Sequence, residues 1–177
     1  MSPHRVCLIG PESTGKTTVA QELARVFETI VVPEFGRYYC EVFGNQCDAD
    51  DLRAIVRGHK LLVAFAERKA RQLLILDTDA VMTAVWADVL LGSRPSDLDR
   101  VDDPADYYLL AEIDVPFQAD TIRYFPDQAA RRDMFSRCKK ELERRALPFA
   151  IISGDREARL KTSVAAIRGH FSDRLAK

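Results

Sequence analysis

The sequence predicts an α/β protein with a doubly wound, five-stranded parallel sheet and helices on both faces. Short, wholly apolar runs alternate with longer stretches in which apolar side chains recur at helical spacing. The apolar runs show no alternation with polar residues, which is typical of parallel strands buried on both faces. Strands and helices that alternate in this way along one chain favour a parallel sheet with helical crossovers.

The expected elements follow one another in a regular order. Strands are expected at residues 6–9, 30–32, 73–76, 107–110 and 149–152. Helices are expected at residues 17–27, 48–71, 81–90 and 128–146, and over a last stretch with Leu160, Val164, Ile167 and Phe171 inward. Asp48 can cap the second helix, and the Pro- and Ser-containing segment from Gly92 to Ala105 is expected to be a loop.

The bulk composition fits one domain. The chain has 177 residues, of which 47% are hydrophobic and 30% charged, so it can bury a core. We find no repeat or linker and expect residues 1–177 to form a single domain. A formal net charge of −1 gives no global reason to expect a nucleic acid or a membrane as partner.

The cysteines and the termini indicate the compartment. No apolar run approaches the length of a membrane span, and the N-terminus lacks the layout of a signal peptide. The spacing of the four cysteines suits neither a zinc site nor a disulfide framework; they are Cys7, Cys40, Cys47 and Cys138. We therefore expect reduced thiols in a cytoplasmic protein, with Cys7 in the core.

A phosphate-binding loop follows the first expected strand. Residues 10–17 read Gly-Pro-Glu-Ser-Thr-Gly-Lys-Thr and match G-x-x-x-x-G-K-[ST] at every fixed position. In such a loop successive backbone N–H groups face the phosphates, Lys16 reaches the β- and γ-phosphates, and Thr17 offers a hydroxyl to Mg²⁺. The residues expected to bind the nucleotide here are Gly10, Glu12, Ser13, Thr14, Gly15, Lys16, Thr17 and Thr18.

Several classes of P-loop protein are disfavoured by what the chain lacks. The guanine-recognition motif Asn-Lys-x-Asp is absent, because the only asparagine, Asn45, is followed by Gln46. A large mechanical ATPase would need an additional subdomain for which the chain has little length. Small-molecule kinases remain, in which a five-stranded P-loop kinase-like domain carries a small arginine-bearing lid. ATP and Mg²⁺ are the expected cofactors.

Carboxylates follow two of the expected strands, at the edge where open α/β sheets bind their ligands. Asp77 follows an apolar strand in the manner of a Walker B aspartate, so we expect it to join Thr17 at Mg²⁺. Its alternative role is a helix N-cap. Glu34 is the preferred general base or ligand of the acceptor hydroxyl, and its alternative is a capping glutamate or one paired with Arg37. Asp79 is the reserve candidate for the base.

Further segments resemble one family of kinases in the same order along the chain. They are Pro33-Glu34-Phe35-Gly36-Arg37-Tyr38-Tyr39, Asp77-Thr78-Asp79, Tyr107 to Leu110 with Asp114-Val115-Pro116-Phe117, Asp120 with Arg123, and Ile152 to Asp155 with Arg159. Together with the phosphate-binding loop, this ordered set resembles the NadR-type ribosylnicotinamide kinases, which phosphorylate nicotinamide riboside. Thr121 and Phe117 depart from the family's glycine and tryptophan.

The resemblance implies roles for residues that composition alone would not single out. Arg123 is implied as a catalytic arginine of the lid. The expected catalytic residues are then Lys16, Glu34, Asp77 and Arg123. The riboside is implied to contact Glu34, Arg37, Tyr38, Asp79 and Asp120. Gly154 and Asp155 are implied to lie on the adenine side of the nucleotide.

Other side chains have two interpretations each. Arg131 and Arg132 are either further lid arginines that neutralise the transferring phosphate or members of an exposed helix face. Aromatic side chains could stack on a flat base, although aromatics at helical spacing more often belong to the core; they are Tyr38, Tyr39, Phe43 and Trp86.

The sequence thus leads to one main hypothesis and two alternatives. The main hypothesis is an Mg²⁺-ATP-dependent kinase that transfers the γ-phosphoryl to a riboside hydroxyl, converting nicotinamide riboside to nicotinamide mononucleotide. The alternatives are a kinase for another nucleoside or small metabolite and a non-catalytic ATP-binding regulatory module. The expected partner is a small-molecule riboside or nucleoside, and the sequence leaves a homo-oligomer open.

Overall fold

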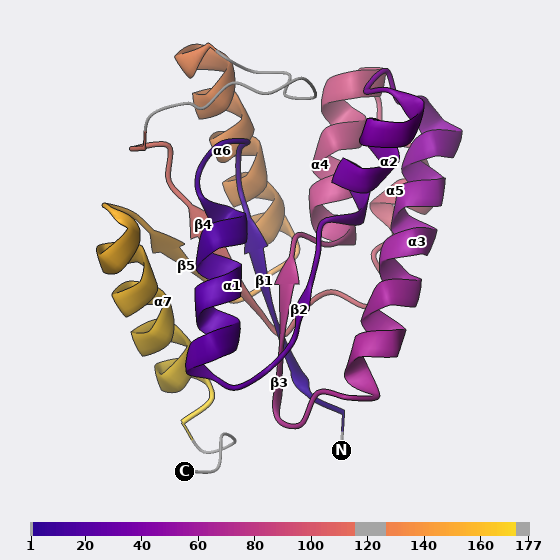
Figure 1. Cartoon of the computed structure of the whole chain (residues 1–177). Coiled ribbons are helices and arrows are strands. Elements are labelled where there is room, and N and C mark those ends of the chain that lie inside the picture. Colours follow the sequence, from indigo (N-terminus) through magenta and orange to yellow (C-terminus); the bar gives the residue numbers. More distant parts are fainter. Residues whose placement is uncertain (1, 116–126, 173–177) are drawn as a thin grey trace.

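The structure, a computed structural model, describes residues 2–115 and 127–172 (Figure 1). Its centre is a parallel five-stranded sheet with the order β2-β3-β1-β4-β5. The strands are β1 His4–Ile9, β2 Val31–Val32, β3 Leu73–Asp77, β4 Tyr107–Ala111 and β5 Phe149–Ile152. The predicted fold class is therefore confirmed, and the loop that follows β1 lies at the middle of the sheet's carboxyl edge.

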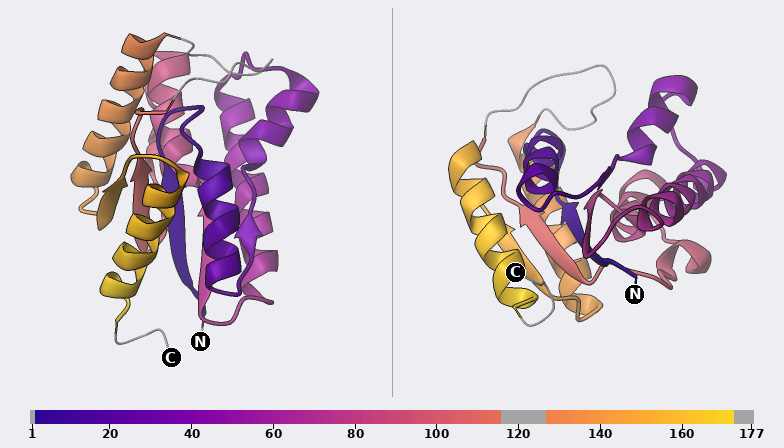
Figure 2. Two further views of the ribbon diagram at one scale, coloured as in Figure 1. Left: turned by 60° about the vertical axis from the view of Figure 1, so that its left-hand side comes forward. Right: turned by 60° about the horizontal axis from the view of Figure 1, so that its bottom comes forward.

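Helices cover both faces of the sheet. They are α1 Lys16–Val26, α2 Phe35–Phe43, α3 Ala49–Glu67, α4 Ala80–Leu91, α5 Ser96–Asp99, α6 Gln128–Arg144 and α7 Arg156–His170. Helices α1 and α7 share one apolar cluster with the sheet, and α3, α4 and α6 share the other. The views in Figure 2 show the sheet between these two layers. The alternation of strand and helix in the sequence predicted this arrangement.

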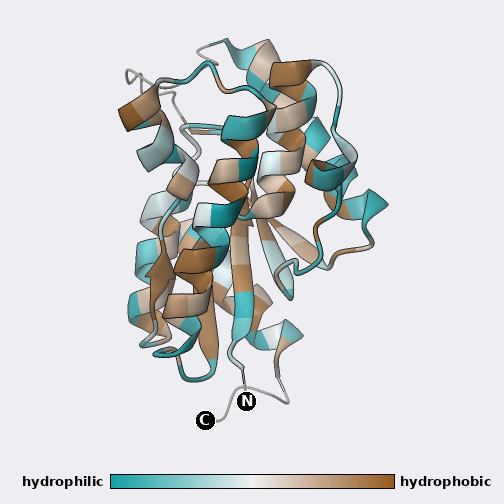
Figure 3. Ribbon diagram, turned by 90° about the vertical axis from the view of Figure 1, so that its right-hand side faces the viewer, coloured by the Kyte–Doolittle hydropathy of each residue, from teal (hydrophilic) through white to brown (hydrophobic). Residues whose placement is uncertain are grey.

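The strands divide their side chains between the two layers. In β1, Val6 and Leu8 pack toward α1 and α7, while Cys7 and Ile9 pack toward the opposite layer. All four side chains are completely buried, which explains the unbroken apolar run and confirms Cys7 as a core residue. Figure 3 shows mainly hydrophobic strands and helices in which hydrophobic and hydrophilic residues mix, as expected for two-layer packing on a buried sheet.

Two helices were not predicted. Residues 92–105 are not wholly a loop, because α5 forms one turn that is held by buried Leu98. Helix α2 follows β2 directly, and it carries Glu34 at its N-cap position. Helix α3 has the predicted cap, since Asp48 accepts hydrogen bonds from the backbone N–H groups of Asp50 and Asp51. No helix within the described residues is long and apolar enough to span a membrane.

Helix α2 packs closely against α3 at Gly58. A Cβ atom at this position would lie 2.2 Å from the ring of Phe35, so Gly58→Ala should displace that ring. Overpacking of this kind typically lowers the free energy of unfolding by about 1–3 kcal/mol. We expect a lower midpoint in urea unfolding. Gly169→Ala is the matched control, because open space surrounds this helical glycine; its expected change is from none to a gain of about 1 kcal/mol.

Candidate active site

The loop between β1 and α1 has the backbone geometry of a phosphate cradle. Gly10 has a φ of 137°, and a Cβ atom there would lie 2.9 Å from the carbonyl oxygen of Ala111. Gly10 therefore permits the close approach of the loop to β4. Gly15 is left-handed, with a φ of 78°, and immediately precedes the first residue of α1. Thr14 Oγ1 donates to the carbonyl of Pro11 at 2.8 Å and closes the turn.

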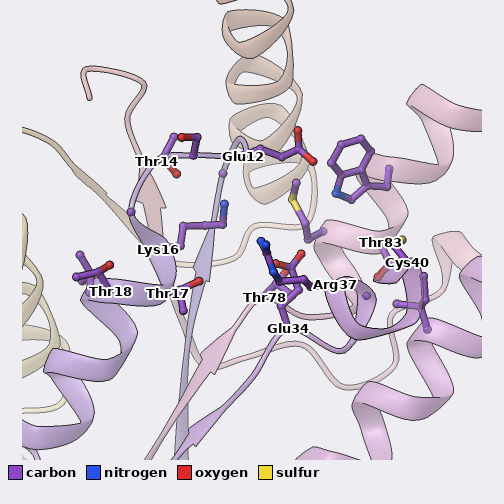
Figure 4. A pocket seen from close by; sticks show the side chains of 18 of the residues that line it. Glu12, Thr14, Lys16, Thr17, Thr18, Glu34, Arg37, Cys40, Thr78 and Thr83 are labelled. Atoms are coloured by element: carbon purple, nitrogen blue, oxygen red, sulfur yellow. The ribbon is translucent and has the colours of Figure 1, made fainter. Parts of the chain in front are cut away.

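This loop forms one wall of a cavity of about 470 Å³ (Figure 4). The strands β2 and β3 end at the same edge, and α2, α3, α4 and the residues that follow β3 contribute to the other walls. The predicted site residues that line the cavity are Gly10, Glu12, Ser13, Thr14, Gly15, Lys16, Thr17, Thr18, Glu34 and Arg37. The remaining wall is largely apolar, with Leu52, Ile55, Met82, Trp86 and Leu90 among its members. One cavity thus combines a phosphate cradle with an apolar compartment.

Asp77 lies directly behind the phosphate-binding loop. Thr17 Oγ1 donates to Asp77 Oδ2 at 2.6 Å, whereas the other carboxylate oxygen is buried without a hydrogen-bond partner among the described residues. Carboxylate and hydroxyl oxygens are ligands that Mg²⁺ prefers, so this pair fits an Mg²⁺ ion held together with substrate phosphates. The alternative role of Asp77 as a helix cap is wrong, because the N-cap of α4 is Asp79.

Asp79 lies beneath the cavity wall with both carboxylate oxygens in use. It accepts a hydrogen bond from the backbone N–H of Val81 at 2.9 Å and another from the hydroxyl of Tyr108. Tyr108 is fully buried, and burial next to Asp79 raises the pKa of its phenol. Asp79 does not line the cavity, in contrast to the substrate contact that the resemblance implied. Its contacts instead fix the turn that follows β3.

Glu34 is partly buried at the edge of the cavity and has several charged neighbours. Burial raises the pKa of its carboxyl group to about 7; Lys16 and Arg37 lower the pKa, and Asp77 raises it. Glu34 occupies the N-cap position of α2, but its side chain makes no capping hydrogen bond. A carboxylate with this pKa that faces the phosphate cradle has the properties of a general base near neutral pH.

Helix α2 also carries Arg37 and Tyr38. Arg37 lines the cavity and forms an ion pair with Glu41, with 3.2 Å between Nε and Oε1. Tyr38 is 52% exposed and is not among the residues that line the cavity. Of the other predicted stacking candidates, Trp86 lines the cavity, Tyr39 packs against the α2–α3 cluster and Phe43 is exposed. Trp86 is therefore the aromatic side chain of this group that faces the site.

The predicted arginines differ in position. Arg131, at the beginning of α6, is buried and donates from Nη2 to the carbonyl of Ser13 at 3.3 Å. Its interpretation as part of an exposed helix face is wrong. Arg132 is exposed and bonds to Gln128 within its own helix, as the exposed-face interpretation predicted. Arg123 and Asp120 lie outside the described residues.

Sequence reasoning missed the structural importance of Arg159. This arginine is only 2% exposed and donates to the carbonyl oxygens of Thr14, Gly154 and Glu112 at 2.8–3.2 Å. It also pairs with Asp114. Arg159 thus joins the phosphate-binding loop, the end of β4 and the β5–α7 connection, which are distant in the sequence.

The β5–α7 connection contains the two residues implied on the adenine side. Gly154 has a φ of 90°, and its N–H donates to Asp114. Asp155 caps α7 by accepting from the N–H of Ala158 at 2.9 Å. Neither residue lines the main cavity, but Arg156 and Arg159 in the first turn of α7 do. The N-terminal end of α7 therefore borders the cavity through these two arginines.

Known proteins resemble this chain in sequence and in fold. The family model described as AAA domain (AAA_28) matches residues 5–159. The chain belongs to this family. It is 26% identical over 170 residues to the trifunctional NAD biosynthesis/regulator protein NadR of Escherichia coli (strain K12), a match that covers 92% of this chain and 42% of NadR. The predicted resemblance to NadR is thereby confirmed, although the chain spans less than half the length of this relative.

Solved structures with the same fold include two of NadR and one of a thymidylate kinase. NadR in complex with NR superposes with a TM-score of 0.76 and 22% identity, covering 99% of this chain and 52% of that one. NadR in complex with NAD and AMP-PNP gives 0.72 and 21%, covering 99% and 51%. Thymidylate kinase from Candida albicans gives 0.69 and 11%, covering 98% and 94%. The fold is therefore that of P-loop kinases.

Proposed function

We propose that the chain is an ATP-dependent small-molecule kinase, formed by residues 1–177 as a single domain, that phosphorylates a riboside. The observation that carries the proposal is one cavity lined by the P-loop, by Thr17, which is hydrogen-bonded to Asp77, and by Glu34, a carboxylate with a pKa of about 7. Such a set supplies phosphate binding, a metal position and a proton acceptor, the three requirements of phosphoryl transfer to a hydroxyl.

Each residue of the site has its own role in the proposed reaction. Lys16 and the loop N–H groups hold the β- and γ-phosphates, while Arg131 lies close to the same loop. The acceptor oxygen attacks the γ-phosphorus in line, the bond to the β–γ bridging oxygen breaks, and ADP leaves. Glu34 takes the proton of the acceptor hydroxyl. Mg²⁺, held by Thr17 and Asp77, would neutralise charge on the phosphates.

Nicotinamide riboside is the proposed acceptor, with nicotinamide mononucleotide as the product. The relatedness to NadR and the likeness to a NadR structure that holds NR support this choice. The apolar compartment beside Glu34, which includes Trp86 and Met82, suits a flat aromatic base. ATP is the proposed donor because the chain lacks the guanine-recognition motif and is related to a protein whose structure holds AMP-PNP.

The test is ADP production from Mg²⁺-ATP with a panel of ribosides that includes nicotinamide riboside, adenosine, cytidine and thymidine. Stoichiometric ADP and a monophosphate product with nicotinamide riboside are expected. Turnover with another member of the panel alone would overturn the proposed acceptor and favour a different nucleoside kinase. ATP binding without turnover of any acceptor would overturn the kinase proposal and favour a regulatory module.

The assignment of Glu34 as the general base predicts a specific pH dependence of kcat/KM. Glu34 must be ionised to accept a proton, and its pKa is about 7. We therefore expect kcat/KM for the acceptor to rise about tenfold per pH unit below pH 7 and to level off above it. A pH profile measured between pH 5.5 and 9 checks this. A flat profile over that range would contradict the assignment of Glu34 as the base.

A further inference from the structure

Thr78 has an unusual backbone conformation at the edge of the cavity. Its φ is 85°, in the left-handed region that favours glycine. Among the described residues, four other than glycine have a positive φ, and Thr78 is the β-branched member of that group. A β-branched side chain in this region is a true outlier, and such strain persists where the surroundings hold it in place and often where function requires it.

The neighbours of Thr78 hold this conformation from both sides. Asp77 precedes it and is bonded to Thr17 Oγ1 at 2.6 Å. Asp79 follows it, caps α4 and accepts from the buried hydroxyl of Tyr108. With both neighbours fixed, the backbone at Thr78 has little freedom to relax. The direction of its side chain is therefore determined by the fold.

The hydroxyl of Thr78 has no hydrogen-bond partner among the described residues although the side chain is more than nine-tenths buried, with 8% exposed. A buried hydroxyl without a partner is destabilising. Thr78 lines the cavity, and in Figure 4 it lies among the wall side chains between Thr17 and Thr83. A strained backbone and a buried, unsatisfied hydroxyl at a residue that lines a ligand cavity indicate that the ligand satisfies this hydroxyl.

We propose that Thr78 is a substrate-contacting residue whose hydroxyl bonds to the acceptor oxygen that becomes phosphorylated. This inference rests on the proposed kinase function. Thr78 donates to one lone pair of that oxygen, the acceptor's own proton points to Glu34, and the second lone pair attacks the γ-phosphorus. When the new P–O bond forms, the proton passes to Glu34 and the bond to ADP breaks. Thr78 orients the nucleophile and is not itself changed.

Three substitutions test the role of the hydroxyl. Thr78→Val keeps the shape, the β-branch and the backbone strain but removes the hydroxyl, whereas Thr78→Ser keeps the hydroxyl and removes the methyl group. Thr78→Gly removes both and relieves the strain, so it provides a folded variant without the hydroxyl if valine is not tolerated. We expect the valine and glycine variants to lose roughly 10–100-fold in kcat/KM for the acceptor. The serine variant should stay within about threefold.

The measurements separate this role from others. The KM for ATP and the Mg²⁺ concentration at half-maximal rate should not change in any variant, and the glycine variant should melt no lower than the wild type. An unchanged kcat/KM in the valine variant, or a serine variant as poor as valine, would overturn the proposal. A shifted Mg²⁺ requirement would assign Thr78 to the metal shell instead and overturn it too. A wild type that turns over no riboside would overturn this proposal together with the kinase function.

Discussion

Replacing Lys16 by alanine is expected to remove nearly all phosphoryl transfer and leave the fold intact. Lys16 is the first residue of α1 and lines the cavity, and its Nζ donates to the carbonyl of Pro11 at 2.7 Å. This contact is within the loop itself, so the ammonium group is positioned beside the phosphate cradle. Loss of a preorganised charge at the transferring group typically lowers kcat by roughly 10³-fold.

The measurement for Lys16→Ala is the rate of ADP formation with saturating acceptor, together with the thermal melting temperature. Lys140→Ala is the matched control, because it removes the same charge from an exposed position of α6. Both variants should melt close to the wild type, and only the Lys16 variant should lose activity. Activity within a few-fold of the wild type for Lys16→Ala would contradict the mechanism.

Glu34→Gln is expected to lower kcat by 10²–10⁴-fold, the range typical for removal of a general base. Glutamine preserves the size and polarity of the side chain but cannot accept the proton. The substitution should also remove the rise in activity near pH 7, because that rise reports the ionisation of Glu34. Glu143→Gln, on the exposed side of α6, is the matched control for loss of a carboxylate. A loss of less than about tenfold would argue against general-base catalysis.

The same substitution should increase stability at alkaline pH. The folded-state pKa of Glu34, about 7, exceeds its ordinary value of 4.5, so between these values the folded protein binds more protons than the unfolded chain. The wild type therefore loses stability as the pH rises through this window. Glu34→Gln lacks this loss and should unfold at a higher urea concentration than the wild type at pH 8. Lower activity with higher stability is typical of a functional carboxylate whose pKa is raised by partial burial.

The elements that the sequence predicted correctly have a strong local signal, either an unbroken apolar run or apolar side chains at helical spacing. Strand β3, for example, is buried throughout its length, so its composition alone distinguishes it from the helices around it. Helix α2 has no fully buried residue, and its packing depends on contacts with α3 that exist only in the folded protein. Helix α5 is a single turn held by Leu98. Weak local signals of this kind cannot be separated from loops without the tertiary contacts.

The residues of the site also differ in how well the sequence predicted them. The phosphate-binding loop is a continuous segment with fixed spacing, so its geometry follows from the sequence. Arg131 and Arg159 contact the carbonyls of that loop from 118 and 145 residues away. The sequence singled out Arg131 as one of two further lid candidates and Arg159 as part of a resemblance, but it did not predict these contacts with the loop. The strain at Thr78 was equally hidden, because a backbone angle depends on the contacts of its neighbours.

The central claim is transfer of the terminal phosphoryl of ATP to a riboside held beside Glu34. The most direct measurement uses ATP labelled with ¹⁸O in the γ-phosphoryl, Mg²⁺ and nicotinamide riboside, with the products identified by mass spectrometry. The account predicts that the label appears in nicotinamide mononucleotide, in an amount equal to the ADP formed, and that Lys16→Ala forms both products roughly 10³-fold more slowly. Label released only as inorganic phosphate, or ADP formation that does not depend on a riboside, would contradict it.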